Sequence, residues 1–407
     1  MKKLLSILCA AVLLATLVIT CVSCGGSSVS ADFKVGAILI GDENEGYTYA
    51  HINGIRTAAK ELGMSDDQII WKYTVPEDEK CYDAAIDLVE QGCSVIFSNS
   101  YGHQSHMKQA AQECPDVTFV AMTGDQAATS GLSNYKNAFT GVYQSRYVAG
   151  VVAGMKLAEL VADGKLTDAN YDGDNIKLGY VGAYPYAEVV SGFTAYYLGV
   201  KSVVENVTMQ VTYTNSWFDI TAEGTVAEAL AADGCVIISQ HADSTGAPAA
   251  VQALQDKGQV IYCVGYNVDM LSVAPNAALT SPTNTWAVYY KYAMETAANG
   301  GTIDTNWAKG YEADAVGITA LGSACAAGTQ EKVDEVVKGL KAGSIKVFDT
   351  SKFTVGGATL PEYLADVDGD FAPDTNAIWD GYFHESEMRS APYFDIRIDG
   401  IVENNNN

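Results

Sequence analysis

Short apolar stretches alternate with amphipathic stretches of helical period through most of this chain, and that order restricts its fold more than any other feature. Residues 33–40 form an apolar run of strand length. In the next segment Ile52, Ile55 and Ala59 recur at helical spacing before Gly63, which is typical of a helix and its end. The repeated order of strand and helix predicts an α/β fold, because parallel strands need crossovers to connect them.

The pattern of strand and helix runs twice along the chain. The first series has expected strands at 33–40, 69–75, 94–99, 118–123 and 138–143. The second series has expected strands at 177–183, 207–213, 235–240 and 260–264. Because 407 residues are too many for one hydrophobic core, the two series predict two doubly wound, Rossmann-like lobes.

A helix rich in small residues at 146–160 marks the first passage between the expected lobes. Its glycines predict close packing against a sheet or the other lobe, or packing among helices only. The expected lobes and tail are 32–145 plus about 278–310 for lobe 1, 146–277 plus about 311–401 for lobe 2, and a disordered tail at 402–407.

The N-terminus has the pattern of an exported lipoprotein. Two lysines precede a long apolar run, which predicts a signal peptide at 1–23. Cys24 precedes glycines and serines, similar to the diacylated cysteine of a bacterial lipobox, with 24–31 as a flexible tether. A plain secretory signal or acylation of Cys21 are the alternatives. We expect lipid anchoring on the extracytoplasmic face of the cell membrane, because no later apolar run is long enough to span it.

Composition restricts the partners of the chain. Its formal net charge of −25 predicts repulsion of nucleic acid and of anionic lipid headgroups, so we expect no nucleic-acid partner. Six cysteines follow Cys24 without a CxxC pair, and most stand in apolar patterns such as 92–96. Buried free thiols are the default for such positions, and the disulfide pairing stays open.

Catalytic and metal-binding patterns are lacking in the sequence. It has neither a GxSxG elbow nor a GxxxxGK phosphate loop. His103 and His106 share one face of a predicted helix but have no third ligand nearby, and the carboxylates are scattered. The sequence therefore predicts a protein that is not an enzyme and has no cofactor and no metal site.

Aromatic and hydrogen-bonding residues follow nearly every expected strand. In open α/β sheets ligands bind beyond the carboxyl ends of the strands, where the loops converge. Facing rings can sandwich a planar heterocycle, with polar side chains at its edge, although each ring could instead pack at the rim or hinge. The candidate ligand-binding residues are Tyr47, Tyr49, Asn99, Tyr101, Tyr184, Trp217, His241, Asp243, Tyr266, Asn267, Asp269, Asn284 and Trp286.

Four stretches together resemble the basic membrane lipoprotein (BMP) family, importer substrate-binding proteins related to purine nucleoside receptors. They are 46–51, 146–150 with Gly154, 215–217 and 265–270, and the resemblance covers about 33–300. It implies a type I periplasmic-binding-protein fold with three interlobe crossings, and an ABC permease that recognises the closed form. It also implies purine base or nucleoside cargo, stacked by Tyr47 and Trp217.

The sequence departs from the pattern of this family at two places. Tyr47 stands where this branch usually has tryptophan and the nucleoside receptors have phenylalanine, a change that keeps stacking. Asn267 stands where the receptors have an aspartate that grips ribose, and 281–284 lacks their nearby lysine. These changes favour a free base over a nucleoside as the ligand, unless Asp269 or Asp243 takes the place of the ribose-binding aspartate. The alternatives are a sensor subunit with the same cleft, or an importer receptor for another planar metabolite or a sugar.

Overall fold

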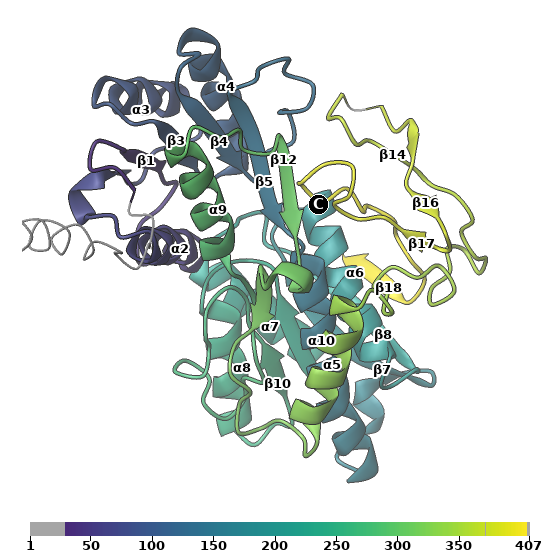
Figure 1. Cartoon of the computed structure of the whole chain (residues 1–407). Coiled ribbons are helices and arrows are strands. Elements are labelled where there is room, and N and C mark those ends of the chain that lie inside the picture. Colours follow the sequence, from purple (N-terminus) through teal and green to yellow (C-terminus); the bar gives the residue numbers. More distant parts are fainter. Residues whose placement is uncertain (1–28, 371, 405–407) are drawn as a thin grey trace, which may run out of the picture.

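Two parallel sheets, each covered by helices on both faces, organise the computed structural model, which describes residues 29–370 and 372–404 (Figure 1). The expected signal peptide at 1–23 and the lipidated Cys24 lie outside these residues. Among the residues described, no helix is both long and apolar enough to cross a membrane.

The first sheet has the strand order β12-β5-β4-β3-β1-β2. Its strands are β1 Val35–Ile38, β2 Ile69–Lys72, β3 Val95–Ser98, β4 Thr118–Met122, β5 Tyr135–Thr140 and β12 Asn306–Lys309. Helices α2 Gly46–Glu61 and α9 Trp286–Ala298 pack together, as do α3 Glu79–Glu90 and α4 Gln104–Glu113. The strands β1, β3 and β5 are buried along their whole length. Nearly all of their residues are apolar or uncharged, as expected for strands that helices cover on both faces.

The second sheet has the order β10-β9-β7-β8-β18. Its strands are β7 Asn175–Gly182, β8 Val207–Tyr213, β9 Ile237–Gln240, β10 Tyr262–Val264 and β18 Ile401–Asn404, and the short β6 Tyr171–Asp172 pairs with β7. The helices are α5 Val142–Ala162, α6 Ala187–Lys201, α7 Ile220–Ala232, α8 Gly246–Asp256 and α10 Thr329–Lys341. Short 3-10 turns lie at Asp66–Gln68, Tyr101–His103, Asp168–Asn170 and Tyr311–Ala313.

The small residues of α5 allow a close approach to α6 within lobe 2. A Cβ added at Gly150 would lie 2.1 Å from the carbonyl oxygen of Tyr196, and one at Gly199 would lie 2.1 Å from that of Tyr147. The glycines therefore serve contact between two helices of one lobe, not contact with a sheet or the other lobe.

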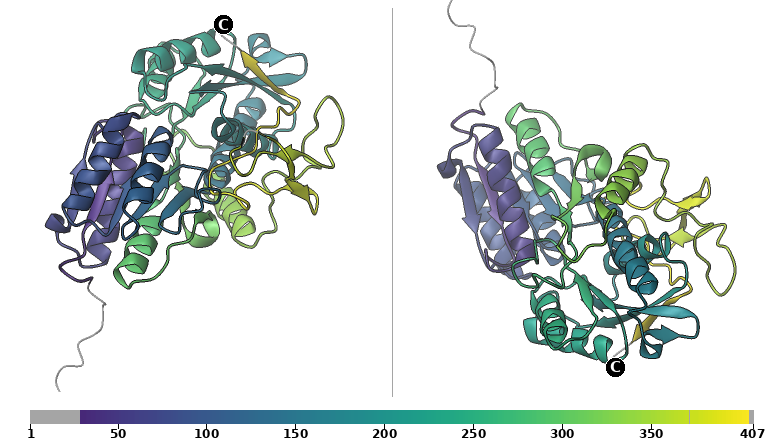
Figure 2. Two further views of the ribbon diagram at one scale, coloured as in Figure 1. Left: turned by 90° about the horizontal axis from the view of Figure 1, so that it is seen from above. Right: turned by 90° about the horizontal axis from the view of Figure 1, so that it is seen from below.

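The chain passes between the lobes three times, which confirms the expected type I fold. It passes from β5 into α5, from β10 towards α9, and from β12 towards α10. The last two passages contain β11 Pro282–Asn284 and β13 Val316–Ile318, which pair antiparallel with each other in the hinge. The views of Figure 2 show the two lobes side by side with these linkers between them.

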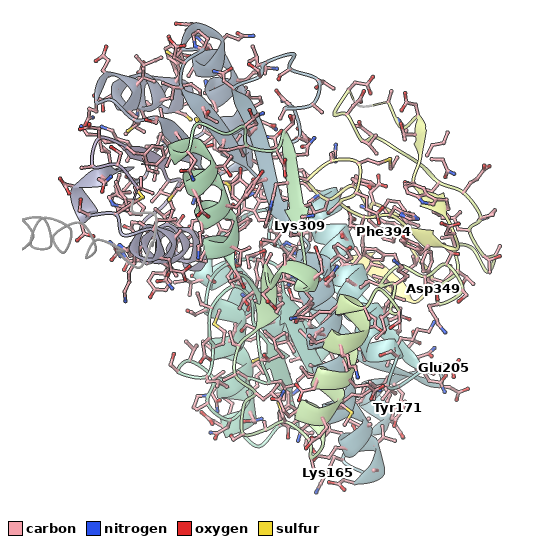
Figure 3. The ribbon with its side chains drawn as sticks, in the orientation of Figure 1. Lys165, Tyr171, Glu205, Lys309, Asp349 and Phe394 are labelled. Carbon is pink, nitrogen blue, oxygen red and sulfur yellow. The ribbon has the colours of Figure 1, made fainter. Side chains whose placement is uncertain are left out.

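A long C-terminal segment, residues 351–404, follows α10 and its connecting turn. It contains β14 Leu364–Ala365, β15 Thr375–Asn376, β16 Ile378–Trp379 and β17 Tyr382–Phe383, and it ends in β18. Phe394 of this segment, labelled in Figure 3, is buried in the core of lobe 2. The expectation of a disordered tail from 402 is wrong for 402–404, because Ile401–Asn404 pair with β8 at the open edge of the sheet.

The six cysteines of the described chain are all free thiols. Cys81, Cys93, Cys235 and Cys263 are buried in the cores. Burial raises the pKa of Cys81, Cys235 and Cys263 to about 12 each, so these thiols stay protonated and unreactive at neutral pH.

Candidate ligand-binding site

A cavity of about 470 Å³ lies where the carboxyl ends of the strands of both lobes face each other. Lobe 1 lines it with Ile40, Gly41, Asp42, Asn44, Glu45, Tyr47, Thr74, Glu77, Asn99, Ser100, Tyr101 and Thr123. Lobe 2 and the linker after it line it with Glu188, Trp217, Phe218, Asp243 and Tyr266. Its volume suits one small organic molecule.

Aromatic rings from both lobes line this cavity. Tyr47 and Tyr101 come from lobe 1, and Trp217 comes from lobe 2. The Trp217 ring lies 5.5 Å from Tyr184, which in turn stacks at 5.2 Å on Tyr186. Such an arrangement offers flat apolar faces on both sides of a ligand.

The start of α2 holds Tyr47 in place. Glu45 caps the helix by accepting hydrogen bonds from the amides of Tyr47 at 3.1 Å and Thr48 at 3.0 Å. The hydroxyl of Tyr47 donates to the carbonyl oxygen of Asn99, and the Asn99 amide donates to Thr48 Oγ1 at 3.1 Å. Asn99 therefore joins β3 to α2 as well as lining the cavity.

The polar lining of the cavity is acidic. It contains Asp42, Glu45, Glu77, Glu188 and Asp243, whereas none of its lining residues is a lysine or arginine. Burial raises the pKa of Glu188 to about 7, against a smaller opposing effect of Arg146. Burial and the neighbouring Glu45 and Glu188 also raise the pKa of Asp243 well above its usual range. The carboxyls can thus accept hydrogen bonds from a ligand, and Glu188 is partly protonated near neutral pH.

Arg146 of α5 supports the cavity from within lobe 2. It is fully buried, and its guanidinium carbon lies 3.7 Å from the ring centroid of Tyr266. One guanidinium nitrogen donates to the Tyr180 hydroxyl at 2.9 Å and to the Gln240 carbonyl at 2.5 Å. The buried charge is stabilised by these acceptors and by the ring face of Tyr266.

His241 lies beside this arginine. Its ring centroid is 5.1 Å from that of Tyr266, and its Nε2 is 3.3 Å from a carboxylate oxygen of Glu188. Burial, and secondarily Arg146, lowers the pKa of His241 well below its usual range. The imidazole is therefore neutral at physiological pH. It does not line the cavity itself but contacts Tyr266 and Glu188, which do.

A chain of hydrogen bonds leads from the cavity into the hinge. The Asn267 amide donates to Asp243 at 2.7 Å, and the Asn284 amide donates to Asn267 at 2.9 Å. Thr140, at the end of β5, donates its hydroxyl to Asn284 at 2.5 Å. Asn267 and Asn284 are thus buried beneath Asp243 and do not line the cavity.

Four other candidate residues lie away from the cavity wall. Tyr49 is exposed beside a smaller hollow that adjoins the cavity and shares Phe218 and Asp243 with it. Asp269 is exposed and accepts from the amide of Leu271 at 2.7 Å. Trp286 is buried in lobe 1, stacked at 4.3 Å on His51, and Tyr184 backs Trp217 without lining the cavity.

The structure adds lining residues that the sequence analysis does not single out. Glu188 is in the first turn of α6, directly after the Tyr184 to Tyr186 loop, so the rule that selected Tyr184 could have found it. Thr74 and Glu77 follow β2, and Thr123 follows β4. The loops after these two strands contain few aromatic residues, so a search for aromatic residues after strands does not select Thr74, Glu77 or Thr123.

One group of acidic side chains lies outside the cavity, at Asp366, Asp368 and Asp370. Their carboxylate oxygens lie within 4.8 Å of one another. Amides of the same loop donate to all three, including that of Gly369 to Asp366 at 2.8 Å. The turn of the loop brings these carboxylates together.

The raised pKa of Glu188 predicts a pH-dependent stability. Between pH 4.5 and about 7 the folded protein binds a proton at Glu188 that the unfolded chain releases, so stability falls as pH rises through this window. We expect Glu188→Gln to be more stable than the unsubstituted protein at pH 8, by about 1 to 3 kcal/mol, because the amide stays neutral.

Urea unfolding of both proteins at pH 4.5 and pH 8 measures this effect. Asp243 and Glu45 also have raised pKa values, so both proteins should lose some stability as the pH rises, and the variant should lose less. The difference between the proteins should disappear at pH 4.5. A difference that is equal at both pH values would contradict the prediction.

Two α/β lobes joined by three crossings, with a cavity between them, form the fold of the periplasmic solute-binding proteins. Among solved structures, a solute-binding protein of an ABC transporter from Aeropyrum pernix K1 superposes with a TM-score of 0.64 at 16% identity, covering 78% of this chain and 93% of that chain. A likeness at this identity concerns the fold alone.

Sequence comparison identifies the family. The Bmp family profile, described as ABC transporter substrate-binding protein PnrA-like, matches residues 40–350. The chain therefore belongs to the BMP family of ABC transporter substrate-binding proteins.

Two relatives carry different ligand names. A purine-binding protein of Brucella abortus (strain 2308) is 32% identical over 267 residues, covering 65% of this chain and 69% of that protein. A candidate ABC transporter glucose-binding protein of Haloferax volcanii is 29% identical over 277 residues, covering 68% of this chain and 64% of that protein.

Proposed function

We propose that this protein is the receptor of an ABC importer for a purine base or nucleoside, held between the rings of Tyr47 and Trp217. The observation that carries the proposal is one cavity with aromatic faces from both lobes and carboxyl acceptors between them. A planar heterocycle fits between rings, and its N–H groups can donate to the carboxyl oxygens of the lining, since each carboxyl has several lone pairs besides those that accept from the protein. Ligand contacts to both lobes favour the closed form, which the permease recognises.

The charge of the lining favours a ligand without phosphate. Asp42, Glu45 and Glu77 line one side and Glu188 and Asp243 the other, with no basic side chain among the lining residues to pair a phosphate. A phosphate would face like charges in a partly desolvated site. Nucleosides and free bases avoid this repulsion, whereas nucleotides do not.

The environment of Asn267 favours a base over its nucleoside. The amide group of this side chain donates to Asp243 and accepts from Asn284, so its donor and acceptor are engaged within the protein. Asn267 therefore does not offer the free carboxylate contact to ribose hydroxyls that the nucleoside receptors have. We propose that adenine or guanine binds more tightly than adenosine or guanosine.

A thermal-shift screen with bases, nucleosides, nucleotides, flavins, amino acids and sugars tests these statements. A ligand that binds only the folded state raises the midpoint, by about 2.7 kcal/mol of added stability at a hundredfold excess over Kd. We expect shifts with a purine base, smaller shifts with the nucleoside and none with the nucleotide. A nucleotide that binds as well as its base would remove the argument from charge.

A sugar receptor is the second candidate function. The Haloferax volcanii relative is named for glucose, and carboxylates beside aromatic faces can also bind sugar hydroxyls and C–H faces. A shift with glucose and none with any purine would replace the first proposal by this one.

We further propose that 1–23 is a signal peptide and that Cys24 is lipidated on the extracytoplasmic face, with no catalytic activity and no cofactor. The pattern of charges, apolar residues and the cysteine supports this export route. A sensor subunit would share fold and cleft, so co-purification with a permease or with a chemoreceptor distinguishes the two partners. Mass spectrometry of the protein from membranes checks the acylated Cys24.

A further inference from the structure

The C-terminal segment, which lies beyond the residues matched by the family, is built into lobe 2. Phe353, Phe383 and Phe394 are buried in the lobe 2 core, and β18 pairs with β8 along four residues. Within the segment, Glu385 accepts from the amides of Tyr393 at 2.8 Å and Phe394 at 2.9 Å. These contacts make the segment part of the rigid body of lobe 2.

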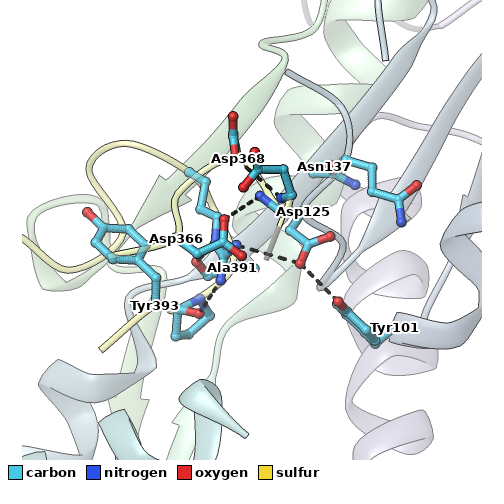
Figure 4. Close-up of polar contacts among 12 residues, drawn as sticks. Tyr101, Asp125, Asn137, Asp366, Asp368, Ala391 and Tyr393 are labelled. Carbon is cyan, nitrogen blue, oxygen red and sulfur yellow. Dashed lines mark hydrogen bonds and ion pairs between the residues drawn. The ribbon is translucent and has the colours of Figure 1, made fainter. Parts of the chain in front are cut away.

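The same segment also contacts lobe 1. Ser390 donates its hydroxyl to Asn306 of β12 at 3.3 Å, and the guanidinium of Arg389 lies 3.7 Å from a carboxylate oxygen of Asp125. Figure 4 shows Asp125 between this segment and Tyr101. The segment therefore joins the lobes at a place separate from the three crossings of the hinge.

The Arg389–Asp125 ion pair is buried and reaches the ligand cavity. Each of the two side chains is only 10% exposed. Asp125 also accepts from the hydroxyl of Tyr101 at 2.9 Å, and Tyr101 lines the cavity. The other two guanidinium nitrogens, Nε and Nη2, donate to the carbonyls of Ala391 at 3.2 Å and Pro392 at 3.1 Å, which fixes the direction of Arg389.

We propose that the C-terminal segment braces the two lobes in the arrangement seen here, with Arg389 and Asp125 as positioning residues for Tyr101. Rotation of lobe 1 away from lobe 2 must break the Arg389–Asp125 contact or pull the segment from its core. A contact present in only one of two arrangements shifts the equilibrium towards that arrangement. The brace rests on the proposed two-lobe binding function, but not on which ligand is bound.

The test is designed so that folding and bracing are separated. Arg389→Met alone would leave Asp125 buried without its counter-charge, which can destabilise the fold itself. The double variant Arg389→Met with Asp125→Asn removes both charges and keeps an acceptor for Tyr101. Arg389→Lys keeps the charge. Arg397→Met is the matched control, because its partner Glu403 at 2.5 Å belongs to the same segment.

Pulsed electron paramagnetic resonance without ligand measures the distance between the lobes. Spin labels are attached at the exposed positions Asn53→Cys in α2 and Ala253→Cys in α8, with the half-buried Cys114 and Cys325 replaced by serine. We expect the short-distance population of the double variant to be at least about threefold smaller than that of the unsubstituted protein, with partial recovery in Arg389→Lys. The affinity for a ligand found in the screen should fall by the same factor, because binding selects the closed form.

Two results would overturn the brace. The first is a double variant whose distances equal those of Arg397→Met and of the unsubstituted protein. The second is an unsubstituted protein that shows only the longer distance without ligand. If no purine binds, the distances between the lobes still test the brace. Failure of the ligand proposal and failure of the brace therefore give different results.

Discussion

Replacing Trp217 with alanine should weaken ligand binding about tenfold or more while the protein stays folded. Trp217 is only half-buried and lines the cavity from lobe 2, whereas Tyr47 lines it from lobe 1, so the indole is available to a ligand. Loss of one stacking face costs about 1 to 3 kcal/mol by analogy with base stacking. Isothermal titration with the ligand identified by the screen measures the change.

Two further variants separate stacking from other effects of the tryptophan. Trp379→Ala removes an equally large ring from the C-terminal segment, which is not among the lining residues of the cavity, and should leave affinity unchanged. Tyr47→Ala should resemble Trp217→Ala, whereas Tyr47→Phe keeps the ring and loses only the hydrogen bond to Asn99. Unchanged affinity in both alanine variants would remove Tyr47 and Trp217 from the site.

Substituting Gly150 with alanine should destabilise the fold by about 3 kcal/mol, because α5 and α6 have no room for a methyl group. The added Cβ would lie 2.1 Å from the Tyr196 carbonyl oxygen and 3.0 Å from Gly199 Cα. Both obstacles are backbone atoms, so no side chain can rotate away and the helices must separate. Urea unfolding gives the difference in free energy.

Gly224 of α7 provides the matched control for this substitution. A Cβ there would lie 3.4 Å from its nearest neighbour, the Gly246 carbonyl oxygen, which is ordinary contact. Gly224→Ala should therefore be neutral or stabilising by about 0.5 to 1 kcal/mol, as expected for glycine replaced within a helix. Equal stability losses in the two variants would show that α5 and α6 can move apart without cost.

The architecture could be predicted from the sequence because the periods of strand and helix are local. Residues 33–40 and the Ile52, Ile55 and Ala59 spacing indicate β1 and α2 without any knowledge of their neighbours. The edge strand β18 could not be predicted in this way. Its register depends on the open edge of β8, some 190 residues earlier, and Val402 itself is exposed.

Prediction of the site was partial for a related reason. Reading the loops after strands selected Tyr47, Tyr101 and Trp217, which do line the cavity, because the ends of parallel strands meet at one edge. The same rule also selected Trp286, whose ring points into the core of lobe 1. A loop position fixes where a side chain begins, but the packing around it decides which way the side chain points.

The sequence by itself determined the order of strands and helices, the division into two lobes and the aromatic character of the cleft, since these follow from local period and from residue type. Only the tertiary structure decided that Asn267 bonds within the protein, that Glu188 enters the cavity and that Arg389 meets Asp125. Each of these depends on groups distant in the chain, and their burial, charge and hydrogen bonding exist only after the lobes have come together.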